Sequence, residues 1–212
     1  MKKPFLSLLA AALAGVAGAG QRADDAGGGW TPLFNGRDLT GWKVQFEDKD
    51  KGADPARTFT VKDGALIVSG KPKGYVYTDK SYTNYVLTYD WRFPEGSSPE
   101  SNSGCLVHIQ PPHKVMPRSV EPQGRYKDHG KIFFIGFKGE ATFDADAHKK
   151  ALRPMGRWST TEVTCGADGS VSVKLNGVPV SGCKTELTSG PIGFQCEGSE
   201  VHFKEIKIRD RK

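Results

Sequence analysis

The chain has 212 residues, of which 25% are charged, and its formal net charge is +6. This length suits one all-β domain whose core is large enough to fold without disulfides. The sequence has no Lys/Arg run before its last residues and no nucleic-acid-binding signature, so we expect no nucleic-acid partner.

The first nineteen residues have the pattern of a signal peptide. Lys2 and Lys3 make the start positive, residues 5–16 are apolar, and Ala17-Gly18-Ala19 is a small-residue cleavage motif. We predict cleavage after Ala19, export to the periplasm or outside the cell, and no membrane span after cleavage; an uncleaved anchor is the alternative. Losing two lysines and no acid lowers the net charge from +6 to +4. Residues 20–29 follow as a flexible linker, and residues 30–212 form the domain.

Extended segments dominate the domain, and helical periodicity is nearly absent. Strands are predicted at residues 58–61, 65–69, 75–78, 84–93, 104–110, 131–137, 160–166, 170–175, 192–197 and 201–209. Asp63-Gly64, Asp168-Gly169 and Asn176-Gly177 are predicted hairpin turns, because these pairs tolerate positive φ. One short helix is predicted at residues 144–152. Many short strands without helices between them favour a sandwich or barrel over an α/β fold.

The cysteines leave two interpretations open. In an exported chain, four cysteines are compatible with two disulfides, and they are equally compatible with buried free thiols. Cys105, Cys165 and Cys196 lie at apolar positions of predicted strands, and Cys183 is the fourth. Because no C-x2-C pair is present, the spacing indicates no zinc site.

Alternation along the strands predicts which side chains share a face. In residues 104–110, Cys105, Val107 and Ile109 are predicted to face the core, and His108 and Gln110 to face away. The same reasoning turns polar side chains outward on three other segments: Arg92, Glu121, Gln123, Arg125, Gln195 and Glu197. Such planar groups bind hydroxyls in pairs, so they predict a sugar groove on a concave sheet. An ordinary solvated sheet face is the alternative.

Four blocks resemble the 3-keto-disaccharide hydrolase family, in the family's order. They are Trp30–Trp42 (WTPLFNGRDLTGW), Asn102-Ser103-Gly104, Pro154–Trp158 (PMGRW) and Gly190–Gln195 (GPIGFQ). The resemblance implies a concanavalin-like jelly-roll β-sandwich of two antiparallel sheets. It also implies cleavage of glycosides already oxidised at carbon 3 of the sugar. The chain departs from the family where members often have a His two residues after the Gln of the last block, since Glu197 stands there.

The polar residues suit this chemistry better than ordinary glycoside hydrolysis. A retaining glycosidase of this fold needs two close carboxylates, as in E-x-D-x-E, whereas this chain has Glu121-x-Gln123-x-Arg125. A ketone at carbon 3 acidifies the proton on carbon 2, so a single base removes it, the group at carbon 1 leaves, and water adds. Glu121 is the predicted base. We expect a nearby Arg to lower the pKa of Glu121 and keep this base ionised.

The other predicted roles follow from the same scheme. Gln123 together with Arg92 or His108 would donate to the enolate oxygen, and Glu197 or His129 would be a second acid/base. The predicted substrate-binding residues are Asn102, Gln110, Arg125, His129, Gln195 and Glu197. No cofactor is predicted, and a divalent metal ion at Asp128 and His129 stays an open alternative. Two other functions compete: a non-catalytic carbohydrate-binding or adhesion module, and a structural accessory domain.

Overall fold

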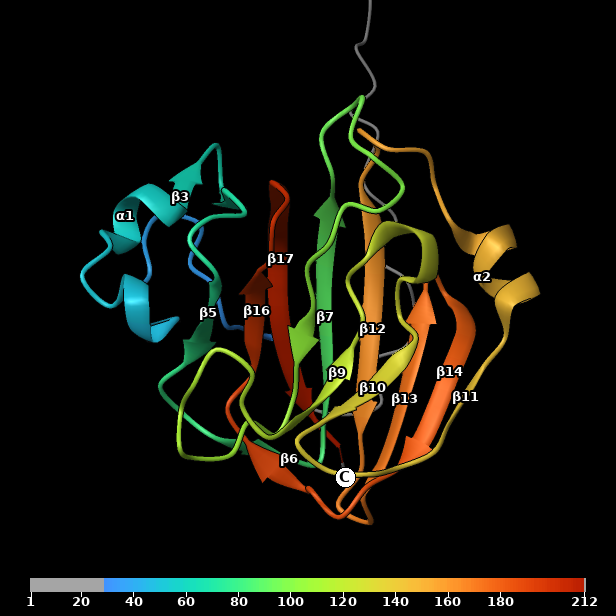
Figure 1. Ribbon diagram of the computed structural model, residues 1–212. Helices are drawn as coiled ribbons and strands as arrows, with labels where there is room; N and C mark the ends of the chain where they lie inside the picture. Colours follow the sequence, from blue (N-terminus) through green and yellow to red (C-terminus); the bar gives the residue numbers. More distant parts are fainter. Residues whose placement is uncertain (1–28, 212) are drawn as a thin grey trace, which may run out of the picture.

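The structure, a computed structural model, describes residues 29–211 (Figure 1). The predicted signal peptide at residues 1–19 and the predicted linker up to residue 28 lie outside the described residues. Within residues 29–211, none of the helices is long and apolar enough to cross a membrane.

Strands make up most of the described chain, which confirms the all-β prediction. The strands are β1 (Thr31–Pro32), β2 (Trp42–Phe46), β3 (Phe59–Lys62), β4 (Ala65–Val68), β5 (Gly74–Thr78), β6 (Tyr82–Thr83), β7 (Tyr85–Arg92), β8 (Cys105–Leu106), β9 (Ser119–Pro122), β10 (Ile132–Ile135), β11 (Ala141–Phe143), β12 (Ser159–Cys165), β13 (Ser170–Leu175), β14 (Val178–Lys184), β15 (Ser189–Gly190), β16 (Gly193–Cys196) and β17 (Val201–Asp210). The short helices are α1 (Pro55–Thr58) and α2 (Ala145–Ala151), with 3-10 turns η1 (Asp48–Asp50) and η2 (Tyr126–Asp128).

The strands form two layers. The first is a nine-stranded sheet in the order β11-β14-β13-β12-β7-β17-β4-β3, with β1 paired to β17. The second contains the four-stranded sheet β2-β5-β16-β8 and the pair β9–β10. Bridges at Gly104↔Gln123 and Val107↔Val120 join β9 to the β8 segment. In Figure 1, β9 and β10 lie in front of β12 and β13. The pairing is antiparallel throughout both layers of the described chain, as the predicted sandwich requires.

Apolar side chains fill the space between the layers. Strand β7 alternates as predicted, with Tyr85, Leu87, Tyr89 and Trp91 turned inward and buried. Phe194 of β16 is the centre of this core on the other layer. Its ring centroid lies 5.0 Å from that of Tyr89 and 4.6 Å from that of Phe203 on β17. Burying such rings removes apolar area from water, which stabilises the sandwich.

Strand β8 is much shorter than the predicted strand 104–110, and its alternation fails after Val107. His108 has a φ of +55°, a left-handed conformation that interrupts an extended strand. As a result Val107 packs in the main core, whereas Ile109 packs with Leu106 and Tyr75 in a separate cluster. His108 is fully buried and lies edge-on to Tyr85. The predicted faces of His108 and Ile109 are therefore wrong.

The four cysteines are free thiols in the structure. Cys105, Cys165 and Cys196 are buried, and Cys183 is half-buried. Burial raises the pKa of Cys105, Cys165, Cys183 and Cys196, so these thiols resist ionisation. Of the two interpretations that the sequence left open, the structure supports buried free thiols.

Candidate functional site

A row of side chains crosses the outer face of the second layer. The β9–β10 register pairs Glu121 with Phe133, and the β16–β5 register pairs Gln195 with Tyr75. Gly104 links the two halves, because its carbonyl accepts a 2.9 Å hydrogen bond from the Gln195 backbone N–H. Glu121 and Gln195 alternate with core residues along their strands, so their side chains face away from the main core. We call Phe133, Glu121, Gly104 and Gln195 the site row.

Gly104 provides the space in which the two polar side chains of this row meet. A Cβ at this position would lie 1.9 Å from Gln195 Oε1 and 2.5 Å from Glu121 Oε1. The Asn-Ser-Gly motif builds this hollow: Ser103 Oγ donates to the Gln195 carbonyl at 2.8 Å, and the glycine follows directly. Glu121 is 5% exposed and Gln195 2% exposed. The motif therefore creates a small, nearly closed polar site.

The carboxyl group of Glu121 has an unusual protonation equilibrium. Burial, helped by the nearby Glu197 carboxylate, raises its pKa from 4.5 to about 8, against the opposing effect of the Arg125 guanidinium. The Arg125 guanidinium stabilises the Glu121 carboxylate only weakly, because its Nε and Nη2 donate to the two carboxylate oxygens of Asp128 at 2.9 and 2.8 Å. The prediction that an Arg holds Glu121 ionised at neutral pH is therefore wrong, since desolvation outweighs the Arg125 charge.

A pocket of about 220 Å³ opens beside Gln195. Its lining residues are Glu47, Lys73, Gly74, Val115, Met116, Gln195, Cys196 and Glu197. Glu197 accepts a 3.0 Å hydrogen bond from Asn102 Nδ2. Gln195 Oε1 and Asn102 Oδ1 are buried without a hydrogen-bond partner in the described chain. Buried acceptors of this kind need donors, which hydroxyl groups of a ligand would provide. The structure thus brings together the predicted residues Asn102, Gln195 and Glu197.

Two predicted amides have structural tasks beside the site. Gln123 Oε1 accepts from the backbone N–H of Arg125 at 2.9 Å, which orders the turn after β9. Gln110 Nε2 donates to the carbonyls of His108 and Ser189 at 3.0 and 2.7 Å. These contacts orient both amide groups beside the site, and their roles as an enolate donor and a substrate ligand stay predictions.

His129 lies in the interior of the sandwich. Its ring stacks on Trp91 at a centroid distance of 3.8 Å, and its Nε2 is 2.7 Å from Thr161 Oγ1. The Thr161 hydroxyl also accepts from Trp91 Nε1 at 2.9 Å. Burial lowers the pKa of His129 to about 3, so its ring is neutral. The prediction of His129 as an acid/base or substrate ligand is wrong, because η2 turns its side chain into the core.

Arg92 and His108 also lie away from the site row. Arg92 is on the outer face of the first layer, where its guanidinium is 4.6 Å from the Trp158 ring centroid and its Nε donates to His202 at 3.3 Å. His108 is in the core, and burial lowers its pKa to about 4. The two predictions are wrong for different reasons. Alternation turned Arg92 outward correctly but does not tell which layer of the sandwich its strand belongs to, whereas the left-handed backbone at His108 turned its side chain inward.

Asp128 and His129 do not form a shared metal site, because Asp128 pairs with Arg125 and His129 turns inward. Within residues 29–211, no group of three or more His, Cys, Asp or Glu residues is arranged to hold a metal ion.

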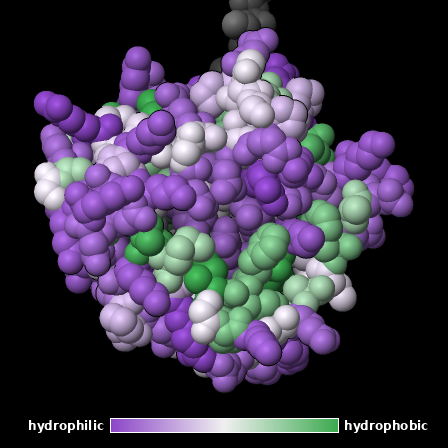
Figure 2. Space-filling model, in the orientation of Figure 1, coloured by the Kyte–Doolittle hydropathy of each residue, from purple (hydrophilic) through white to green (hydrophobic). Residues whose placement is uncertain are grey.

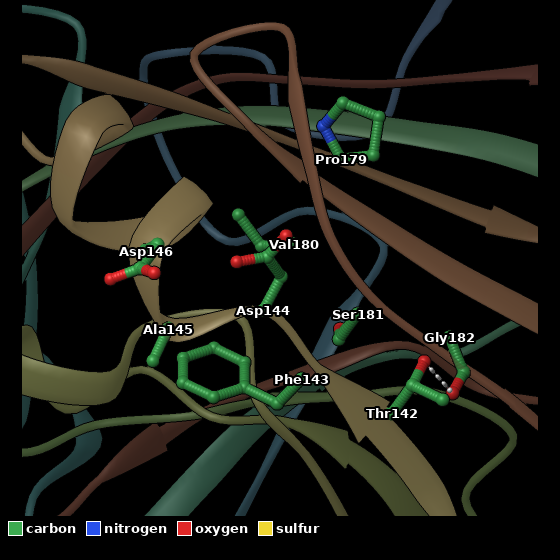
Figure 3. A pocket seen from close by; sticks show the side chains of 9 residues that line it. All are labelled: Thr142, Phe143, Asp144, Ala145, Asp146, Pro179, Val180, Ser181 and Gly182. Carbon is green, nitrogen blue, oxygen red and sulfur yellow. Dashed lines mark hydrogen bonds between the residues drawn. The ribbon is translucent and has the colours of Figure 1, made fainter.

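Another hollow lies away from the site row, between α2, β11 and β14 (Figure 3). Three of the polar side chains around it, those of Thr142, Asp144 and Ser181, have partners within the chain. Asp144 caps α2 by accepting from the Ala147 backbone N–H at 2.9 Å. Thr142 Oγ1 donates to the Gly182 carbonyl at 3.1 Å. This hollow therefore offers little chemistry.

The comparisons with known proteins agree with the geometry. The family described as "3-keto-alpha-glucoside-1,2-lyase-like domain" matches residues 29–209. A candidate glycosyl hydrolase from Parabacteroides distasonis ATCC 8503 is similar in structure, with 25% identity, a TM-score of 0.62, and coverage of 87% of this chain and 94% of that one. A carbohydrate-binding module from Bacillus subtilis has 8% identity, a TM-score of 0.56, and coverage of 82% and 98%, and shows the fold alone. A comparison with curated proteins gives no match.

Proposed function

Because the chain belongs to the 3-keto-alpha-glucoside-1,2-lyase-like family, we propose that it cleaves glycosides whose sugar is oxidised at carbon 3. One observation carries the proposal: Glu121 and Gln195 converge over Gly104, and Gln195 opens onto a 220 Å³ pocket that also contains Glu197. A pocket of this size accommodates a small polar group such as one sugar ring. Carbohydrate is therefore the proposed partner.

Glu121 is the proposed base. Its carboxylate takes the proton from carbon 2, and the electrons of that bond form the enolate of the carbon-3 ketone. The enolate then expels the group at carbon 1 with the bonding electrons, which leaves a double bond between carbons 1 and 2. Water adds its hydroxyl to carbon 1 and its proton to carbon 2, so the net reaction is hydrolysis. A pKa of about 8 makes Glu121 a stronger base than an ordinary carboxylate, although a smaller fraction is ionised at neutral pH.

The neighbouring polar groups have supporting roles in this proposal. The Gln195 amide offers both a donor and an acceptor to the sugar, and its position over Gly104 places it beside Glu121. Glu197, held by Asn102, is the proposed second acid/base, which passes on to the leaving group the proton that Glu121 has taken from carbon 2. A preorganised donor next to a developing enolate is typically a large contribution to catalysis.

The test is the substitution Glu121→Gln, which keeps the shape of the side chain and removes the base. We expect kcat on a 3-keto-glucoside to fall by about 100-fold or more, while affinity for the sugar changes little. Glu162→Gln is the matched control, because Glu162 is on the other layer, where it pairs with Lys174. Cleavage of the unoxidised parent glycoside at a comparable rate would contradict the elimination route.

The second candidate is a non-catalytic carbohydrate-binding module, which the fold shared with such a module favours. The same substitution separates the two functions. A binding module would show no turnover by the wild-type protein, and Glu121→Gln would change only its affinity for sugar.

We also propose that residues 1–19 are removed and that the mature protein is exported. Sequencing the N-terminus of the protein from its native host tests this, with a start near Gly20 expected. Recovery of Met1 would contradict it.

A further inference from the structure

An exposed aromatic ring lies beside the carboxyl group of the proposed base. The β9–β10 register places Phe133 directly opposite Glu121 on one face, where paired side chains have Cβ atoms about 4.5–5.5 Å apart. Phe133 is 36% exposed and belongs to neither core cluster of residues 29–211. Packing of the fold therefore gives no reason for a large apolar side chain here.

The surface beyond Phe133 continues as a hollow that has aromatic rings on its wall, together with the charged residues Lys138 and Glu140. Three phenylalanines, Phe133, Phe134 and Phe137, line it together with Ile132 and the segment 138–141. Gly139 lies close against the Phe134 ring, where a Cβ would come within 2.5 Å of the ring edge. Figure 2 shows apolar side chains gathered over the region of β9 and β10, beside a hollow with hydrophilic walls.

The two sides of Glu121 along the site row differ in the groups that they offer. One side, which we call the polar side, has the side chains of Gln195, Asn102 and Glu197 beside Val115 and Met116. The other, which we call the apolar side, begins with the Phe133 ring. A base acting at carbon 2 stands next to the bond between carbon 1 and the leaving group, so sugar and leaving group extend in different directions from it. Sugar hydroxyls placed on the phenylalanines would lose hydrogen bonds to water at a cost of about 1–3 kcal/mol each.

We propose that the apolar side binds the leaving group, so that the preferred substrates are 3-keto-glycosides of phenols or other aromatic alcohols. This inference rests on the proposed function and names its substrate class. In the elimination step, Glu121 takes the proton from carbon 2, and the electron pair of the carbon 1–oxygen bond leaves with the phenolate oxygen. The phenolate needs little help from an acid, because it is a weak base, and it takes its proton from solvent.

The experiment compares phenyl and methyl 3-keto-glucosides of the same anomer in wild type and Phe133→Ala. Each substrate is compared with itself, so the different reactivity of the two leaving groups cancels. We expect Phe133→Ala to lower kcat/KM for the phenyl substrate about fivefold to tenfold, as for loss of one aromatic contact, and to leave the methyl substrate within about twofold. Phe133→Tyr should retain the activity on both.

Phe143→Ala is the matched control, because Lys131 Nζ lies 5.6 Å from the Phe133 ring centroid and 5.8 Å from that of Phe143. It removes a ring near the same lysine and should affect both substrates alike. Equal losses on both substrates in Phe133→Ala, or no loss on either, would overturn the inference. If the wild type cleaves neither substrate, the proposed function fails. In that case the Kd values of the phenyl and methyl 3-keto-glucosides are measured by titration calorimetry in wild type and Phe133→Ala. A loss of affinity for the phenyl compound alone would then show that the apolar side binds the aromatic group.

Discussion

Replacing Gly104 by alanine tests the geometry of the site row most directly. The new Cβ would lie 1.9 Å from Gln195 Oε1 and 2.5 Å from Glu121 Oε1. Since unbonded heavy atoms come to rest about 3.5 Å apart, the two oxygens must retreat by about 1 to 1.6 Å. Both atoms are the far ends of side chains that can rotate, so we expect the free energy of unfolding to fall by only about 1 kcal/mol.

The effect on turnover should be much larger. A displacement of about 1 Å in a catalytic group can lower the rate about 100-fold, and here both polar side chains move together. The assay is kcat/KM on a 3-keto-glucoside, measured beside thermal unfolding. Gly52→Ala is the control, because a Cβ there meets nothing within 4 Å. The double variant G104A/Q195A should regain stability without regaining activity. Wild-type kcat/KM in Gly104→Ala would refute the assignment of the site.

Four further predictions concern protonation, the core and the thiols. The kcat/KM of the wild type should rise with pH and level off above about pH 8, where Glu121 is ionised; a rate that falls through pH 8 would make Glu121 an acid. Between pH 4.5 and about 8 the native state keeps a proton on Glu121 that the unfolded chain releases. The free energy of unfolding should therefore fall by up to about 1.4 kcal/mol per pH unit as pH rises. Urea titrations at several pH values should show this slope weakened in Glu121→Gln, and an unchanged slope would contradict it. Thr161→Val should destabilise by about 2–4 kcal/mol in urea, because it deprives both His129 and Trp91 of a buried partner; a loss below about 0.5 kcal/mol would show that the network contributes nothing. Thiol titration should find four free cysteines after unfolding without reductant, and very slow reaction of Cys105, Cys165 and Cys196 in the native state; fewer than four would reveal a disulfide.

Strong alternation made part of the fold predictable. The predicted strands 84–93 and 170–175 correspond to β7 and β13. The predicted helix 144–152 corresponds to α2, whose N-cap Asp144 precedes Ala145. Strand β14 was not predicted, because Pro179 and Gly182 interrupt its pattern and its order comes from pairing with β13.

The candidate site was predictable only in part. The polar residues Glu121, Gln195 and Glu197 do gather, since Glu121 and Gln195 alternate with core residues on strands of one layer and Glu197 directly follows β16. His108 escaped prediction because a left-handed residue other than glycine leaves no mark in the sequence. Phe133 was not predicted as a site residue, because an aromatic residue in a strand is usually expected to be in the core. The sequence does contain an indication of its position: Phe133 alternates with Ile132 and Phe134, which pack in the core, so its side chain must point outward.

The strands of the two layers differ in how continuously they pair, and this affects local unfolding and tolerance to substitution. The first layer is one sheet whose neighbouring strands pair from β11 to β3, whereas the site row crosses strands as short as β8, joined to β9 only through isolated bridges. Fewer ladder hydrogen bonds mean that the second layer opens at lower free energy. Amide exchange should therefore be faster around Gly104 than in β7. Substitutions there would also disturb folding less, which lets the substrate range diverge while the ladder behind it is retained.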